Sequence, residues 1–156
     1  MAEKERSRGN VNEIIPGLLQ RGKVLSWTRE VKVKYFKEWG VNALVNFWPK
    51  IDNDLGEMDL DFYWQLSCPR SEGMLQSRMM FAAEVIADYI RLKPQRTALI
   101  LCEAGKTRSV FFCILVVAIV QKLSYTDAKD LVLEAVGSTA LKGFMLDWIK
   151  AEDARK

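Results

Sequence analysis

The stretch Ala98–Ser109 reads ALILCEAGKTRS and carries the strongest signal for fold and for chemistry in this chain. Its apolar start is typical of a short strand buried in a parallel sheet, and a long apolar pattern of helical length follows it. A strand, a tight turn containing Gly105 and a helix N-terminus form an anion-binding site, because turn N–H groups and the helix dipole attract phosphate oxygens. The stretch therefore predicts a phosphate-binding loop at the end of a buried strand.

Two side chains of this loop predict a reaction as well as binding. Cys102 stands at the end of the strand, where the same positive field favours the nucleophilic thiolate over the thiol. Arg108 offers a planar pair of N–H groups to two phosphate oxygens at once. The pattern thus favours cleavage of a phosphate ester through a phosphocysteine. The expected phosphate-binding residues are Glu103, Ala104, Gly105, Lys106, Thr107 and Arg108.

Two other interpretations of the stretch have to be weighed. A cysteine in an apolar strand is commonly a small buried hydrophobe without chemistry, but the Gly, Arg and Ser that follow Cys102 favour phosphate binding. Gly105-Lys106-Thr107 also matches the end of a nucleotide-triphosphate loop, and that motif needs a further glycine five positions before its second one. Ile100 occupies this position, so the spacing excludes such a loop.

The loop resembles the signature loop of the cysteine-dependent protein tyrosine phosphatase superfamily, H-C-x5-R-[ST]. Its form C-x-A-G-x-x-R-S is most similar to the dual-specificity branch. Further stretches resemble landmarks of that branch in the same order, namely IPGLL at 15–19, WGVNALVNF at 39–47 and KLSYTDA at 122–128. The resemblance covers residues 11–150 and implies one phosphatase-like domain between flexible ends at 1–10 and 151–156.

The resemblance also implies a mechanism. Cys102 would attack phosphorus, Arg108 and the loop amides would hold the phosphate oxygens, and Ser109 would hydrogen-bond the departing thiolate. No metal or other cofactor is expected, because the loop supplies the positive charge that a metal would otherwise provide. The expected partner is a phosphorylated protein or another phosphomonoester substrate.

The chain departs from the family pattern at two positions. The family's histidine before the nucleophile is replaced by Leu101, and the chain contains no histidine at all. The family's general acid is an aspartate on an earlier loop, but the corresponding stretch here, LSCPRSEG at 66–73, contains none. Glu72 is the only carboxylic acid of that stretch. It is therefore the candidate general acid, and a solvated surface carboxylate is the alternative.

The same departures keep a second function open, a pseudophosphatase that binds phosphorylated partners or small phosphates with little or no turnover. Cys102 and Ser109 favour the enzyme, because a protein that only binds phosphate needs neither. The form C-x-A-G-K-x-R, with Lys106, resembles loops of family members that act on phosphoinositides, and similar loops act on RNA 5′-phosphates. A phosphoprotein substrate ranks first, and these non-protein phosphates are the alternative.

Composition limits the other possibilities. A chain of 156 residues with 49% hydrophobic residues suits one domain with one core. An odd number of cysteines, three, gives no disulfide framework and suits a reducing compartment. A net charge of +3 is too small to indicate nucleic-acid binding. Val110–Val120, the most apolar run, is shorter than the span of about twenty residues that a membrane requires. We expect a cytoplasmic monomer without a secretory signal or membrane span.

Strand and helix patterns alternate along the chain. Strands are expected over 14–20, 43–47, 62–66 and 98–101, and helices over 28–39, 75–92 and 110–120 and twice more after Ser124. Such alternation predicts an α/β fold of three layers, with a central, mostly parallel sheet flanked by helices.

Overall fold

The computed structural model describes residues 10–24, 26–48, 55–56, 58–103, 106–137 and 141–155. Within these residues, five strands form one sheet in the order β1-β2-β5-β3-β4. The strands are β1 (Asn12–Ile15), β2 (Leu18–Gly22), β3 (Ala43–Asn46), β4 (Phe62–Gln65) and β5 (Ala98–Cys102). Only β1 pairs antiparallel, with β2, and the other pairs are parallel. The predicted mostly parallel sheet is therefore confirmed.

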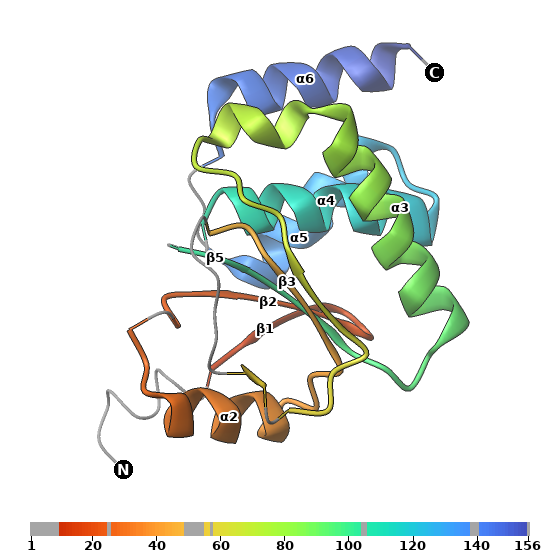
Figure 1. Ribbon diagram of the computed structural model, residues 1–156. Coiled ribbons are helices and arrows are strands. Elements are labelled where there is room, and N and C mark those ends of the chain that lie inside the picture. Colours follow the sequence, from red (N-terminus) through yellow and green to blue (C-terminus); the bar gives the residue numbers. More distant parts are fainter. Residues whose placement is uncertain are drawn as a thin grey trace.

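Helices cover both faces of this sheet, which confirms the predicted three layers (Figure 1). One face carries α2, and the other carries the remaining helices, with a 3₁₀ helix, η2, between β4 and α3. The helical bounds are α2 (Arg29–Glu38), η2 (Ser71–Leu75), α3 (Ser77–Leu92), α4 (Arg108–Gln121), α5 (Tyr125–Val136) and α6 (Gly143–Ala154).

The side chains of β5 alternate between two apolar clusters, and this alternation decides where the nucleophile points. Ala98, Ile100 and Cys102 belong to the larger cluster, on the side of α3 and α4. Leu99 and Leu101 belong to the smaller cluster, on the side of α2. Because successive strand residues face opposite sides of a sheet, Cys102 is directed toward the start of α4 and Leu101 away from it.

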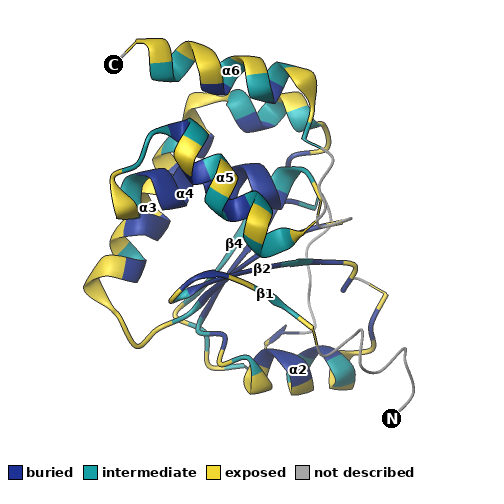
Figure 2. Cartoon of the chain, turned by 180° about the vertical axis from the view of Figure 1, so that it is seen from behind, coloured by how far each residue is buried: buried dark blue, intermediate teal, exposed yellow. Residues whose placement is uncertain are grey.

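Helix α4 is buried almost all round, as its apolar sequence predicts (Figure 2). Every residue from Ser109 to Ala118 is buried, whereas α2, α3 and α6 each expose one face (Figure 2). The apolar run is thus the core of the domain. Of the helices in the described part of the chain, none has the length and apolarity to span a membrane.

Helix boundaries differ from the sequence-based expectation chiefly at the C-terminal end. Helix α6 continues to Ala154, past the flexible end expected from residue 151. The reason is Asp153, whose carboxylate accepts hydrogen bonds from the backbone N–H groups of Tyr125 (2.8 Å) and Thr126 (3.0 Å). These are among the N–H groups that a helix start leaves without an internal partner. The end of the chain therefore stabilises the start of α5, next to the predicted cap Ser124.

Candidate active site

The predicted nucleophile lies at the edge where the parallel strands end. Cys102 is the last residue of β5 and is 4% exposed. Its register partner on β2 is Gly22, and the neighbouring residue Leu101 pairs with Asn46 at the end of β3. The crevice beyond the carboxyl ends of the strands is where open α/β sheets bind ligands. The thiol thus stands at the position in the fold that suits a reactive group.

A chain of hydrogen bonds, partly buried at Asn12 and buried from Gln20 onward, leads to the Cys102 sulfur. Ser109 Oγ lies 3.1 Å from Cys102 Sγ, and Gln20 Nε2 donates to the same Ser109 oxygen over 2.8 Å. Asn12 Nδ2 in turn donates to Gln20 Oε1 over 2.9 Å. The Ser109 oxygen accepts from Gln20. Either atom of the Cys102–Ser109 pair can be the donor when the thiol is protonated, and the Ser109 hydroxyl can donate its proton to a thiolate at Cys102. This orientation suits stabilisation of a thiolate.

Arg108 is anchored by the loops that follow two neighbouring strands. Its Nη1 donates to the backbone carbonyl of Phe47, just after β3, over 3.2 Å, and to the carbonyl of Cys68, after β4. Both carbonyls lie at the same strand edge as Cys102. A guanidinium has five N–H donors in a rigid fork, so anchoring through Nη1 fixes the plane of the others. An Arg held in this way can bind a phosphate with two parallel hydrogen bonds.

The loop between β5 and α4 is held at its first residue. The backbone N–H of Lys23 donates to the carbonyl of Glu103 over 2.8 Å, so the loop after β2 fixes the start of the predicted phosphate-binding loop. Thr107 precedes α4 without capping it through its side chain. The first N–H groups of a helix without such a cap are available to an anion. Lys106 is exposed and Thr107 half-buried, whereas Ala104 and Gly105 lie outside the described residues.

The sequence matches no protein-family model and no curated protein, whereas solved structures match nearly the whole chain. Human DUSP28 matches with a TM-score of 0.73 at 13% identity, covering 93% of this chain and 93% of that chain. The Cydia pomonella PTP-2 phosphatase matches with a TM-score of 0.74 at 16% identity, covering 91% of this chain and 89% of that chain. A structure of PTPMT1 in complex with PI(5)P gives 0.73 at 12% identity, covering 93% and 95%.

The chain adopts the dual-specificity phosphatase fold. Cys102 ends β5 and Arg108 begins α4, so the described part of the signature stretch has the strand and helix that the sequence resemblance implied. In this fold Cys102 and Ser109 are in contact, and Arg108 reaches the loops after β3 and β4 at the same edge of the sheet.

Leu101, in place of the family's histidine, belongs to the apolar cluster on the α2 side of the sheet and has Arg21 and Asn46 as its two register partners. It is 2% exposed and lies in register with Arg21 on β2. The Arg21 guanidinium stands 5.1 Å from the Trp27 ring centre and 5.9 Å from that of Trp39. Burial lowers the pKa of Arg21. In this dual-specificity phosphatase fold, the surroundings of Leu101 therefore combine apolar contacts, the cation–π contacts of Arg21 and the hydrogen-bonded side chain of Asn46.

Glu72, the candidate general acid, lies in η2 and is exposed. It lines a cavity of about 290 Å³ together with Cys68, Pro69, Arg70, Gly73, Gln76 and Arg78. The cavity adjoins the site, because the carbonyl of Cys68 accepts a hydrogen bond from Arg108. Glu72 thus lines a cavity next to the Arg108 site, and its side chain is exposed to solvent.

The other thiols of this fold differ from Cys102 in position. Cys68 is buried, and its Sγ lies 3.1 Å from the carbonyl oxygen of Arg70. Burial raises the pKa of the Cys68 thiol, and the positive charges of Arg108 and Arg78 oppose that rise. Cys113 is fully buried on α4, where burial and then the charge at Cys102 raise its pKa. Among the described residues, no cluster of three or more His, Cys, Asp or Glu has the arrangement of a metal site.

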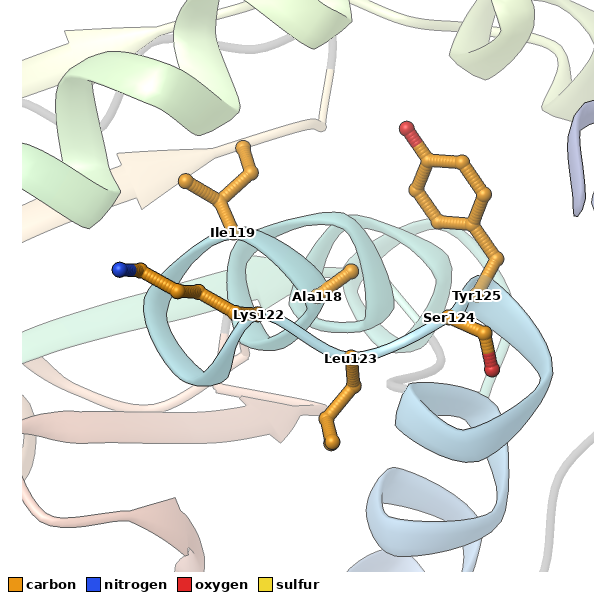
Figure 3. Close-up of a pocket in the computed structure, with 6 residues that line it drawn as sticks. All are labelled: Ala118, Ile119, Lys122, Leu123, Ser124 and Tyr125. Atoms are coloured by element: carbon orange, nitrogen blue, oxygen red, sulfur yellow. The ribbon is translucent and has the colours of Figure 1, made fainter. Parts of the chain in front are cut away.

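A separate cavity of about 470 Å³ lies at the far end of α4 (Figure 3). Helix α4 has 14 residues, which puts this end about 20 Å from the signature loop. The labelled side chains point in different directions, with Ile119 and Tyr125 on one side and Leu123 and Ser124 on the other (Figure 3). They do not converge on one point, so this cavity adds nothing to the site.

Sequence reasoning missed Gln20 and the carbonyls that anchor Arg108. Gln20 is fully buried within the strand sequence LLQRG. A polar amide in an otherwise apolar strand was the available signal, because a buried amide needs hydrogen-bond partners. The two carbonyls carry no sequence signal, since every residue has one.

Proposed function

We propose that this protein is a phosphomonoester hydrolase of the dual-specificity phosphatase type that acts through a phosphocysteine intermediate. The observation that carries the proposal is the convergence of Cys102, Ser109 and Arg108 at one strand edge. The Cys102 sulfur lies 3.1 Å from the Ser109 hydroxyl, which Gln20 orients over 2.8 Å. A buried nucleophile with its own hydrogen-bond donor beside an anchored Arg is more than phosphate binding needs.

In the first step, the Cys102 thiolate attacks phosphorus and the bond from phosphorus to the ester oxygen breaks. Arg108 and the N-terminal N–H groups of α4 stabilise the charge on the phosphate oxygens, and such fixed donors are commonly the largest catalytic contribution. The leaving oxygen takes a proton from Glu72 or from water. In the second step, water attacks the phosphocysteine, inorganic phosphate departs, and Ser109 stabilises the thiolate that is released.

The substrate we favour is a phosphoprotein, with phosphotyrosine first. A non-protein phosphate is the second candidate, for which the exposed cation Lys106 on the signature loop is the supporting observation. One structural neighbour, PTPMT1, was solved in complex with PI(5)P.

A phosphate-binding protein with little turnover is the alternative function. Leu101 and the exposed position of Glu72 favour it, because they leave the site without the family's histidine and without a buried general acid. Nitrophenyl phosphate separates the two functions, since its phenolate leaves without a proton donor.

The deciding experiment compares nitrophenyl phosphate turnover by wild type, Cys102→Ser and Cys113→Ala. We expect Cys102→Ser to abolish turnover and to retain tungstate binding, because a serine hydroxyl stays protonated at this site. Cys113→Ala removes a fully buried thiol on α4 and should keep turnover. Turnover by Cys102→Ser would exclude the phosphocysteine, and a wild type that binds tungstate without turnover would establish the alternative.

A further inference from the structure

The outer face of α3 carries all the large apolar side chains that are exposed in the described part of the chain. These are Phe81 (65% exposed), Val85 (37%) and Leu92 (78%). The helix packs its other face, which includes Met79 and Ala83, into the larger apolar cluster, and it leaves one face open to solvent (Figure 2). Single exposed apolar side chains are common on protein surfaces, but a group of them on one surface marks an interaction site.

The three apolar side chains belong to a longer stripe along α3. Arg78, Phe81, Val85, Asp88 and Leu92 are all exposed, and they follow one another at spacings of 3, 4, 3 and 4 residues. At about 3.6 residues per turn, this spacing keeps all five on one side of the helix. It is also the spacing at which the side chains of paired helices contact each other. We call these five residues the α3 stripe.

The α3 stripe is complementary to a second copy of itself in the antiparallel direction. With a two-fold axis at the level of residue 83, Phe81 of one copy lies opposite Val85 of the other, and Arg78 lies opposite Asp88, because both pairs are centred on that residue. One register therefore matches an apolar pair and a pair of opposite charges together. A two-fold axis forms each pair twice.

A pocket beside Val85 can receive the Phe81 ring of the second copy. It has a volume of about 270 Å³ and is lined by Phe62, Tyr63, Trp64 and Val85. The three aromatic residues belong to β4, the last strand of the described sheet on this side. Contacts between aromatic rings favour such packing. Phe81 stands one helical turn before Val85, so the protruding ring and the pocket lie on the same surface, as a two-fold interface requires.

The charges of the α3 stripe select the antiparallel direction. Arg78 Nη2 donates to the carbonyl of Ser67 over 3.0 Å, and among the described residues Arg78 forms no ion pair with a carboxylate. Asp88 pairs with Arg91 at the surface, where such pairs contribute little to stability. In a parallel pair of helices Arg78 would meet Arg78 and Asp88 would meet Asp88, whereas the antiparallel pair joins opposite charges.

We propose that the α3 stripe is the contact surface of a homodimer, in which two copies of this chain pack their α3 helices antiparallel. The dimer replaces the monomer expected from the sequence, and it does not depend on the proposed phosphatase activity. One helix from each copy makes a small interface compared with the about 1,200–2,000 Å² of stable complexes. The association is therefore weak and depends on protein concentration.

The test measures the sedimentation velocity of the whole protein over a range of concentrations. Wild type should shift from one chain toward two chains as the concentration rises, and Phe81→Ser should abolish this shift. Arg78→Asp and Asp88→Arg should each raise the dissociation constant by about tenfold or more, because like charges then face each other twice across the interface.

The decisive measurement mixes the two charge variants. In a mixed pair, the acidic group introduced at position 78 of one chain meets the basic group introduced at position 88 of the other. The native Asp88 and Arg78 meet at the second contact. The mixture should therefore form dimers at concentrations at which each variant alone is a single chain. Glu134→Lys is the matched control, an exposed charge reversal on α5, and should associate like wild type.

Each result bears on the inference. A wild type that stays a single chain at every concentration would overturn it, and the occupant of the α3 stripe would then be a different protein. A folded Phe81→Ser variant that associates like wild type would also overturn it. If Phe81→Ser does not fold, the mixed charge variants decide, because both changes lie at exposed positions. Folded charge variants that stay apart when mixed would exclude the antiparallel pairing.

Discussion

The loop after β5 and the loop after β4 meet at the same edge of the sheet, yet they are built in opposite ways. After β5, Cys102 and Ser109 are buried and joined to Gln20 by short hydrogen bonds. After β4, residues 69–70, 72 and 76–78 are exposed. The first loop thus holds the nucleophile rigidly, and the second presents charged groups to solvent. In the mechanism we propose, attack on phosphorus depends on the buried loop, whereas protonation of the leaving group depends on the exposed one.

The largest effect is expected where the two loops are joined, at Arg108. Arg108→Ala removes the phosphate clamp and also the contacts to the carbonyls of Phe47 and Cys68. Turnover of nitrophenyl phosphate should fall by about 10²–10³ or more, the usual cost of one electrostatic donor. Tungstate affinity should fall with it. Arg108→Lys is the matched variant, which keeps the charge but not the planar fork, and retention of full activity there would contradict two-pronged binding.

A smaller effect is expected within the buried loop, at Ser109 and Gln20. In the proposed mechanism, Ser109→Ala removes the hydrogen bond to the departing thiolate, and a hydrogen bond to a charged group is worth about 1.5–3 kcal/mol, or roughly 10–150-fold in rate. Because the bond stabilises the departing thiolate, the second step should slow most, and a burst of nitrophenol should precede the steady state in stopped-flow experiments.

Gln20→Leu should reproduce that burst in weaker form, because Ser109 then loses the donor that orients its proton. Asn12→Ala acts one bond further from sulfur and should change the rate least of the three. If all three variants behave alike, the hydrogen-bond chain has no graded effect on the sulfur.

The next prediction concerns Glu72, the carboxylate of the exposed loop after β4 and the candidate general acid. Glu72→Gln should barely change nitrophenyl phosphate turnover but should slow an alkyl phosphate by at least about tenfold, since general-acid help is worth about 10²–10⁴ for poor leaving groups. The ratio of the two rates is the measurement. Equal effects on both substrates would make Glu72 a surface charge, and the proton would then come from water.

The smallest effect is expected in the labelling rate of Cys68, a thiol in the loop after β4 whose carbonyl contacts Arg108. Burial raises its pKa, so in the folded protein it stays protonated to higher pH than an ordinary thiol. In a Cys102→Ser background, iodoacetamide should modify Cys68 slowly at neutral pH and faster as the pH rises into the alkaline range. Mass spectrometry of the labelled peptide gives the rate. Labelling of Cys68 as fast as that of a free thiol at neutral pH would mean that the loop after β4 opens.

The contrast between the loops also explains how far the sequence could predict this site. The strand that ends at Cys102 and the helix that begins at Arg108 are close together along the chain, so local patterns were enough to predict them. Gln20 meets Ser109 across 89 residues, and Arg108 reaches the carbonyls of Phe47 and Cys68 across 61 and 40 residues. Such contacts follow from strand order, which hydrophobic periodicity does not specify. The parallel sheet was predictable, but the order β1-β2-β5-β3-β4 was not.

The packing of Leu101 has a consequence for how the pH dependence of this protein is interpreted. The position below the nucleophile carries an aliphatic group, and the chain has no histidine anywhere. It therefore lacks the one side chain whose ordinary pKa lies in the physiological range. A phosphate monoester loses its second proton at a pKa of about 6. No imidazole anywhere in the chain can therefore contribute to the acid side of a pH–rate curve between about pH 5 and 7, a range in which the second ionisation of the substrate falls.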